Sequence, residues 1–430
     1  MNTLDELKPL AEDILCKLVE GNFSAVVSLF DSAMLQALPE AKLKEIWLQM
    51  VGQAGQFKQE LACKAVELGV HRIVTVTCQF ENAVYDINVV FNQQGQVGGL
   101  NYQMAAAYVT YHAPAYVDES AFHEAEVTVG SGEWALPATL SLPVGPAPFP
   151  ALVLVHGSGP NDRDESLGPN KVFRDLAWGL ASQGIAVLRY EKRTKAHASQ
   201  FTPELIARLT VQEETIDDAL AAVQLLRQNS AIDPSRIYVL GHSLGATVAP
   251  RIGQQDPAIA GLIIMAGMAR TFEDTILDQF TYLYGLSGAM SDAQKADLEQ
   301  LKRKVARVKD PTLSNKTPAN DLPLNISPSY WLDLRANPPT EIAKTLAMRL
   351  LIMQGGRDYQ VSAAGDFPLW QKALAGKNNV TFKLYPKLYH LFIAGEGPST
   401  PQEYSIEGHV SEEVIHDIAH WILGGVMNIL

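Results

Sequence analysis

The sequence predicts an α/β protein with a mostly parallel central sheet, a helical insertion within that sheet and a small α+β domain before it. Three observations support this prediction. Residues 1–104 pass from helical periodicity into alternating and β-branched segments. From residue 151, short apolar runs alternate with helical segments, which is the order of a parallel sheet with crossover helices. Over residues 268–346 this alternation stops, and helical segments flank a loop rich in Pro and Asn.

The composition is that of a globular protein and excludes several classes of function. Of the 430 residues, 47% are hydrophobic and 19% are charged. The net charge of −13 argues against nucleic acid or an anionic membrane as a partner. No apolar stretch reaches the roughly 18 residues of a membrane span. The first residues lack a signal peptide, so we expect a cytoplasmic protein, or a secreted or periplasmic one if a signal peptide was removed.

Residues 1–104 are predicted to form an accessory domain. Apolar residues at helical spacing, from Leu4 to Leu18, are followed by segments that predict strands at 59–66, 73–79, 83–91 and 96–102. This layout resembles the cone-shaped fold of the nuclear transport factor and ketosteroid isomerase superfamily. We expect a structural role, with a homodimer formed through this domain, and small-ligand binding is the alternative. The cysteines Cys16, Cys63 and Cys78 have neither disulfide nor zinc spacing.

The rest of the chain is predicted to form a sheet domain in two parts, 105–267 and 347–430, with 268–346 as a cap. An insertion of this size between two strands is usually a lid over the strand ends. The first part has predicted strands at 108–116, 124–129, 135–142, 151–155, 185–189, 237–240 and 259–265, with helices at 172–183, 211–228 and 244–253. The second part has predicted elements at 348–353, 370–374, 380–385 and 412–423.

The segment Gly241-His242-Ser243-Leu244-Gly245 lies between a predicted strand and a predicted helix. This G-x-S-x-G pattern is typical of a sharp turn that exposes a nucleophilic serine. Glycines on both sides allow the neighbouring backbone to approach, because they carry no Cβ. The pattern predicts Ser243 as a nucleophile, and the Leu244 N–H at the helix start as a donor to developing negative charge.

A second glycine-rich turn, 156–160, follows the apolar strand 151–155. We expect the Ser158 N–H to complete an oxyanion hole, with Gly157 beside it in contact with substrate. A phosphate-binding loop is the alternative, but the turn lacks G-x-G-x-x-G and G-K-[ST]. The charged residues 161–165 fit either a solvated face or a network that braces the loop. His242 is expected to be packed or to line the substrate pocket.

An acid and a base are predicted at two further strand ends. Asp358 follows a strand and a Gly-Gly turn, and Asp366 is the second candidate. Among the histidines after Asp358, His390 directly follows the strand 380–385. Ser243, Asp358 and His390 therefore occur in the order of one of the convergent catalytic triads. His416 and His420 have the spacing of zinc ligands, but no third ligand is evident, so we expect a solvent-facing helix and no metal.

Together these residues resemble the α/β-hydrolase superfamily over residues 124–430. The His156–Pro160 turn and the stretch 189–193 (Arg-Tyr-Glu-Lys-Arg) are similar to those of a bacterial branch of serine hydrolases. That branch includes carboxylesterases and relatives of the prolyl-oligopeptidase and dienelactone hydrolase groups. The resemblance implies Ser243 as nucleophile, His390 as base, Asp358 as acid, and no cofactor.

We therefore expect hydrolysis of small to medium carboxylic esters through an acyl-enzyme on Ser243. The alternatives are a peptidase of the prolyl-oligopeptidase type and a binding protein without catalysis, although a scaffold alone needs no triad. Tyr330 and Trp331 of the cap are expected to line a substrate pocket, unless they pack the cap on its scaffold.

Overall fold

The structure is a computed structural model that describes residues 3–68, 71–105, 108, 111–286 and 288–424. It divides into two compact units, residues 1–111 and 112–430, and each is described by itself. The predicted boundary after residue 104 coincides with the end of the last strand of the first unit. Within the described residues, no helix is long and apolar enough to cross a membrane.

The first unit packs four helices against an antiparallel sheet whose strand order is β1-β2-β3-β4. Its elements are α1 (Leu4–Val19), α2 (Phe23–Val27), α3 (Ser32–Ala37), α4 (Glu40–Ala54), β1 (Phe57–Leu68), β2 (His71–Phe80), β3 (Val84–Phe91) and β4 (Val97–Met104). Helix α1 begins at a capping box in which Thr3 and Glu6 satisfy each other's backbone N–H groups.

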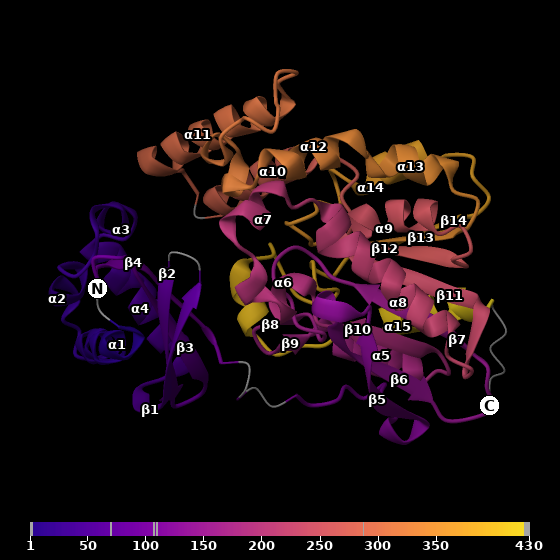
Figure 1. Cartoon of the computed structure of the whole chain (residues 1–430), viewed down its shortest axis with the longest axis horizontal. Helices are drawn as coiled ribbons and strands as arrows, with labels where there is room; N and C mark the ends of the chain where they lie inside the picture. Colours follow the sequence, from indigo (N-terminus) through magenta and orange to yellow (C-terminus); the bar gives the residue numbers. More distant parts are fainter. Residues whose placement is uncertain (1–2, 69–70, 106–107, 109–110, 287, 425–430) are drawn as a thin grey trace. The chain divides into compact units, whose positions relative to one another are not determined.

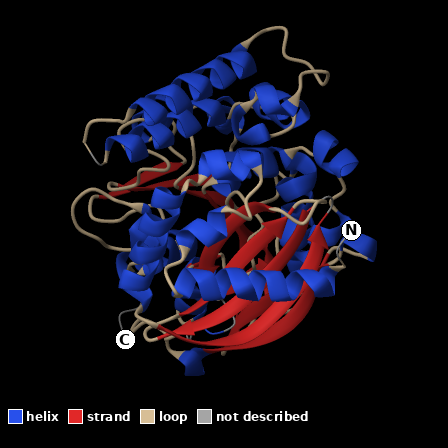
Figure 2. Ribbon diagram, turned by 90° about the vertical axis from the view of Figure 1, so that its left-hand side faces the viewer, coloured by secondary structure: helices blue, strands red, loops and turns tan. Residues whose placement is uncertain are grey.

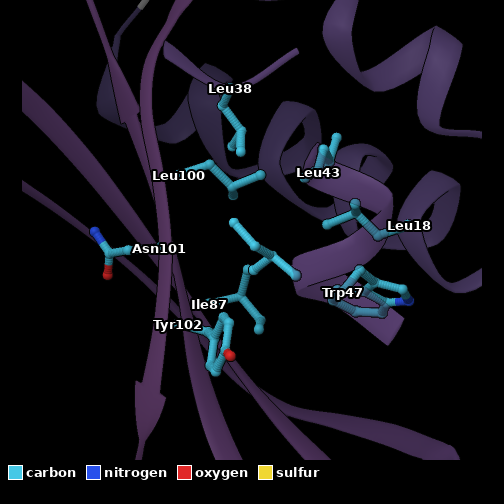
Figure 3. Close-up of a pocket in the computed structure, with 9 residues that line it drawn as sticks. Leu18, Leu38, Leu43, Trp47, Ile87, Leu100, Asn101 and Tyr102 are labelled. Carbon is cyan, nitrogen blue, oxygen red and sulfur yellow. The ribbon is translucent and has the colours of Figure 1, made fainter. Parts of the chain in front are cut away.

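An apolar cavity of about 250 Å³ lies inside this first unit, between the helices and the sheet (Figure 3). Aliphatic side chains and Trp47 line most of it, with Asn101 and Tyr102 at one side.

The second unit is built on an eight-stranded sheet in the order β14-β13-β12-β11-β7-β10-β6-β5 (Figure 1). Neighbours from β14 to β10 are parallel, and β6 and β5 are antiparallel at one edge. The strands are β5 (Phe122–Val129), β6 (Leu136–Pro143), β7 (Phe149–Val155), β10 (Ala186–Tyr190), β11 (Ile232–His242), β12 (Gly261–Met265), β13 (Arg349–Gly355) and β14 (Val380–Tyr385). The predicted fold class is confirmed.

Helices cover both faces of this sheet (Figure 2). Alternate residues of β7 enter two separate cores, Val153 on one face and Leu154 on the other, as the pleat requires. One core includes α8 (Asp217–Arg227) and α9 (Leu244–Gln255), and the other includes α5 (Val172–Ala181) and α15 (Glu412–Leu423). A strand that is buried on both faces therefore has a continuous apolar run as its sequence pattern.

The insertion between β12 and β13 forms a helical cap segment along one side of this unit (Figure 1). It has a small core of its own, which includes Ile276, Val308 and Trp331. Its helices are α10 (Phe272–Gly285), α11 (Asp292–Lys309), α12 (Pro328–Ala336) and α13 (Pro339–Thr345).

One predicted strand is wrong over the residues that can be compared. Residues 111–116 form no strand, and residues 109–110 lie outside the described residues. Pro114 lies in the middle of the predicted run, and proline has no N–H to donate to a strand ladder. Val, Tyr and Thr at 108–111 produced the β-like pattern in the sequence.

Candidate active site

Ser243 lies at a strained turn between β11 and α9. Its φ of 55° and ψ of −114° fall in a region that L-residues rarely adopt. A Cβ on Gly241 would lie 2.2 Å from the carbonyl carbon of Gly245, and a Cβ on Gly245 would lie 2.2 Å from the Val155 oxygen. Only glycine fits at both positions, so the sequence pattern follows from the geometry of the turn.

His390 and Asp358 form a buried pair beside this turn. His390 Nδ1 lies 2.8 Å from Asp358 Oδ2, and the two side chains are 4% and 0% exposed. Asp358 Oδ1 accepts hydrogen bonds from the N–H groups of Gln360 and Val361, and Oδ2 accepts one from Gln354 Nε2. Because Nδ1 donates to the carboxylate, Nε2 is the nitrogen of His390 that is left to accept a proton.

The loop that carries His390 is fixed to the residue next to Ser243. The Nε2 atom of His242 lies 3.0 Å from the His390 carbonyl oxygen, and the two rings are 4.8 Å apart between centroids. Within the described residues, no hydrogen bond joins Ser243 Oγ directly to the His390 ring. Contacts between nucleophile and base often tighten only when substrate is bound. Ser243, Asp358 and His390 follow β11, β13 and β14, whose carboxyl ends lie at one edge of the sheet.

Two backbone N–H groups near Ser243 are available for a developing oxyanion. Leu244 is the first residue of α9, where an N–H has no acceptor inside the helix. Gly157 lies against the nucleophile, since a Cβ there would be 3.2 Å from Ser243 Cβ. The Gly157 N–H is occupied by Glu165 Oε1 at 2.6 Å. The Ser158 N–H has no acceptor among the described residues, and Ser158 is exposed.

Glu165 is a residue of this site that sequence reasoning left open. Its Oε2 lies 2.7 Å from His242 Nδ1, and the two side chains are 2% and 3% exposed. Both ring nitrogens of His242 thus face acceptors, which requires the doubly protonated ring. Burial lowers the pKa of His242, but the Glu165 carboxylate outweighs this, so the pKa lies above its usual value. Burial alone would raise the pKa of Glu165, and the positive ring holds it below its usual value.

The charged stretch 161–165 is therefore a bracing network and not a solvated face. Asp164 pairs with Arg189 at 2.7 Å, with side chains 7% and 1% exposed. Arg163 pairs with Glu191 at 2.9 Å. His242 is packed into this network, so the structure gives no support to its expected contact with substrate. The sequence signal for the network was the density of charged residues directly after a buried strand. That signal does not tell which residues the charged side chains of 161–165 pair with.

Lys192 also reaches the glycine-rich turn and pairs with Glu214. Sequence reasoning noted the stretch 189–193 but assigned Lys192 no role, and it missed Glu214. Lys192 Nζ donates to the Gly157 carbonyl oxygen at 2.8 Å and pairs with Glu214 Oε1 at 2.7 Å. Glu214 lies in a π-helical turn, Gln212–Ile216, and π-turns occur frequently at functional sites. The hydroxyl of Tyr330 donates to Glu214 Oε2 at 2.7 Å.

The structure gives no support to the expected substrate contacts of Tyr330 and Trp331 and favours the packing alternative. Tyr330 is 7% exposed and belongs to the main core, and burial raises its pKa well above the usual value. Trp331 is 1% exposed and stacks on Phe272 with ring centroids 5.5 Å apart. Neither residue lines any of the four cavities considered among the described residues. Tyr330 packs α12 against the sheet domain, and Trp331 packs inside the cap segment itself.

The alternative sequence candidates occupy other positions. Asp366 is 0% exposed and accepts hydrogen bonds from the backbone of Ala269 and Arg270 and from the Arg270 side chain, so it braces the start of the cap segment. His416 and His420 are exposed on α15, and His416 lies 3.3 Å from Glu412.

A cavity of about 560 Å³ adjoins the turn that carries Asp358. It is bounded by α10, by the residues after β13 and by the loop 397–399, and its walls include Asp278, Tyr282, Arg357, Asp358, Tyr359 and Ser399. Ser243 is not among the residues that line it, so the cavity adjoins Asp358 and not Ser243.

A serine at a strand-to-helix elbow, served by an aspartate-bound histidine from later strand ends, is how α/β-hydrolases build a nucleophile on a parallel sheet. The fold and the site thus define a serine hydrolase of this class. The chain belongs to the family described as "Serine aminopeptidase, S33", whose model matches residues 148–396. A second model, of a protein family of unknown function (DUF3887), matches residues 11–100.

A curated relative is similar over nearly the whole chain. Esterase EstD of Thermotoga maritima is 38% identical over 407 residues, which cover 94% of this chain and 93% of the relative. Two solved structures resemble part of the chain. Est1E from Butyrivibrio proteoclasticus is 14% identical, with 70% of this chain and 98% of that chain covered and a TM-score of 0.44. A Pyrobaculum calidifontis esterase is 15% identical, with 70% and 85% covered and a TM-score of 0.45.

Proposed function

We propose that the protein is a carboxylesterase that cleaves small to medium carboxylic esters through an acyl-enzyme on Ser243. The observation that carries the proposal is the Asp358–His390 pair, whose loop is fixed by His242 against the elbow of Ser243. This arrangement supports His390 as the acceptor of the Ser243 hydroxyl proton.

The proposed reaction has two stages. His390 Nε2 takes the Ser243 hydroxyl proton as Oγ attacks the ester carbonyl carbon, and the Ser158 and Leu244 N–H groups stabilise the oxyanion. The tetrahedral adduct expels the alcohol, which receives the proton from His390. Water, deprotonated by His390, then attacks the acyl-enzyme, and the carboxylic acid leaves as Ser243 regains its proton. Asp358 keeps the His390 ring in the tautomer that both stages need.

An ester is favoured over a peptide because the acidic groups that could anchor an amino terminus are already occupied. On α10, Asp274 pairs with Lys309 at 2.5 Å and Asp278 pairs with Arg270 at 2.5 Å. Glu273 is buried at 7% exposure. The curated relative is named an esterase, which supports the same choice. The peptidase that the family description names is the second candidate.

Hydrolysis of an aryl acetate and of an aminoacyl anilide by the full chain tests this proposal. We expect turnover of the ester, with the anilide slower by several orders of magnitude, and loss of both activities in Ser243→Ala. Anilide turnover equal to or faster than that of the ester would replace the esterase by the peptidase. Ester turnover that survives in Ser243→Ala would overturn the acyl-enzyme.

Two further expectations remain proposals. A homodimer formed through residues 1–104 predicts a mass of twice 46.9 kDa in sedimentation of the full chain, and a monomeric mass at micromolar concentration contradicts it. A cytoplasmic location predicts recovery in the cytoplasmic fraction of the native cell, and recovery in the periplasm or the medium contradicts it.

A further inference from the structure

The peptide that joins Gly157 to Ser158 is held from one side by a buried ion pair. The Gly157 carbonyl oxygen accepts a hydrogen bond from Lys192 Nζ at 2.8 Å, and the same ammonium lies 2.7 Å from Glu214 Oε1. These two side chains are 2% and 9% exposed. Asn161 Nδ2 also donates to the Gly157 oxygen at 3.2 Å.

A second buried ion pair holds the preceding peptide. The Gly157 N–H donates to Glu165 Oε1 at 2.6 Å, while Glu165 Oε2 pairs with His242 Nδ1 at 2.7 Å. Gly157 is thus bound at its N–H by a carboxylate and at its carbonyl oxygen by an ammonium. Both charges are themselves neutralised within the protein interior.

This arrangement fixes the direction of the Ser158 N–H. The carbonyl of Gly157 and the N–H of Ser158 belong to one planar trans peptide and point in opposite directions. An ammonium and an amide that hold the oxygen therefore also fix the N–H, which points in the opposite direction within that plane. Hydrogen bonds to the oxygen also polarise the peptide, which makes its N–H a stronger donor.

We propose that Lys192 and Glu165 are positioning residues that aim the Ser158 N–H at the oxyanion. The proposal rests on the proposed function, because it needs an oxyanion at Ser243. Lys192 contacts no substrate and acts through the Gly157–Ser158 peptide. Tyr330 extends the same arrangement into the cap segment, since its hydroxyl donates to Glu214 Oε2 at 2.7 Å.

Ion pairs that only stabilise the fold would behave differently from positioning residues. Their removal would lower stability but leave the rate of the folded enzyme unchanged. A positioning role predicts a lower kcat with an unchanged KM, since the oxyanion exists only in the transition state. It also predicts weaker inhibition by a trifluoromethyl ketone, whose adduct on Ser243 carries an oxyanion.

The double variant Lys192→Met/Glu214→Gln tests the proposal without stranding a buried charge. Replacing both partners of a buried pair is often neutral for stability, whereas removing one is costly. The matched control is Arg227→Met/Asp256→Asn, which removes an ion pair of 2.5 Å. Asp256 lies at the far end of α9, about 20 Å along the helix from Ser243.

With the full chain and an aryl acetate, we expect kcat of the double variant to fall on the order of 10- to 100-fold, with KM within about twofold. The inhibition constant of the trifluoromethyl ketone should rise by a similar factor. The control should keep wild-type values. Glu165→Gln, which weakens the grip on the Gly157 N–H, should lower kcat in the same way.

A folded double variant and a folded Glu165→Gln that both keep wild-type kcat and inhibition would overturn the inference alone. A wild-type chain that does not cleave the ester, and whose Ser243 is not labelled by a fluorophosphonate, would instead overturn the proposed function. The two failures are therefore distinguishable in one set of measurements.

Discussion

His242 Nε2 and the carbonyl oxygen of His390 lie 3.0 Å apart, so the histidine next to Ser243 holds the loop of the histidine that we propose as base. The two rings lie side by side but have different electrostatic partners. His242 faces Glu165 and a carbonyl, which keeps it charged, and His390 donates to Asp358. The buried His242 ring thus links the turn of Ser243, the glycine-rich turn and the loop of His390.

Asp358 and Asp366 are distinguished by their partners, and their amide variants should differ accordingly. Asp358→Asn offers the His390 Nδ1 an amide group, which favours the wrong tautomer, and should lower kcat by roughly 10⁴-fold with little change in KM. Steady-state kinetics on an aryl acetate measure this effect. Asp366→Asn is the matched control, because Asp366 binds Arg270 and backbone N–H groups.

The control should lose thermal stability and keep kcat within about tenfold. Equal losses of kcat in the two variants would contradict the assignment of Asp358 as the acid.

Gly157→Ala should impair catalysis through its contact with the nucleophile. The added Cβ would lie 3.2 Å from Ser243 Cβ and 3.3 Å from Glu165 Oε1, so either Ser243 or the turn must shift. We expect kcat to fall on the order of 10-fold or more, since small displacements of reacting groups are costly. Gly285→Ala is the control, because its Cβ meets nothing within 4 Å. Wild-type kcat in Gly157→Ala would show that the turn has room beside Ser243.

His156 should make the protein less stable as the pH falls. Burial lowers the pKa of His156 to about 4. The unfolded chain takes up the proton below about pH 6.5 and the folded chain does so only near pH 4, so stability is lost across that interval as pH falls. At pH 5 the expected loss relative to pH 7 is about 2 kcal/mol. Chemical unfolding of wild type and His156→Gln at both pH values tests this. The variant should lose less stability between them, and an identical loss would contradict the prediction.

Trp331→Phe should leave the kinetics unchanged, because Trp331 packs inside the cap segment. Its indole stacks on Phe272, and Phe preserves an aromatic ring there. The indole N–H has no hydrogen-bond partner within the described residues, so the substitution removes no such bond. We expect KM and kcat on an aryl acetate within about twofold of wild type. A several-fold rise in KM with an unchanged melting temperature would restore the substrate contact that the sequence predicted.

The turn of Ser243 and the pairing of Asp358 with His390 could be anticipated because their signals are local or follow from the order of the strands, while their catalytic roles stay a proposal. Ser243 needs glycines two residues before and after it, and these are visible in the sequence. Asp358 and His390 each directly follow a parallel strand, and parallel strands bring their carboxyl ends to one edge of the sheet.

The supporting ion pairs could not be predicted, since each joins distant segments through loop conformation. Glu165 reaches His242 across 77 residues, from a backbone with a φ of 47° that no sequence signal marks. Glu214 pairs with Lys192 from a π-helical turn before α8, and no sequence signal marks that turn. The positions of Tyr330 and Trp331 could not be predicted either, because aromatic residues in a cap serve equally for packing or for a pocket wall.

Covalent labelling of the full chain by a fluorophosphonate tests the central claim most directly. Intact mass and peptide mapping would be compared for wild type and Ser243→Ala, with circular dichroism to verify that both are folded. The account predicts one phosphonyl group per wild-type chain, attached to the peptide that contains Ser243, and none on the folded variant. A label on another residue, or labelling of Ser243→Ala at the wild-type rate, would contradict it.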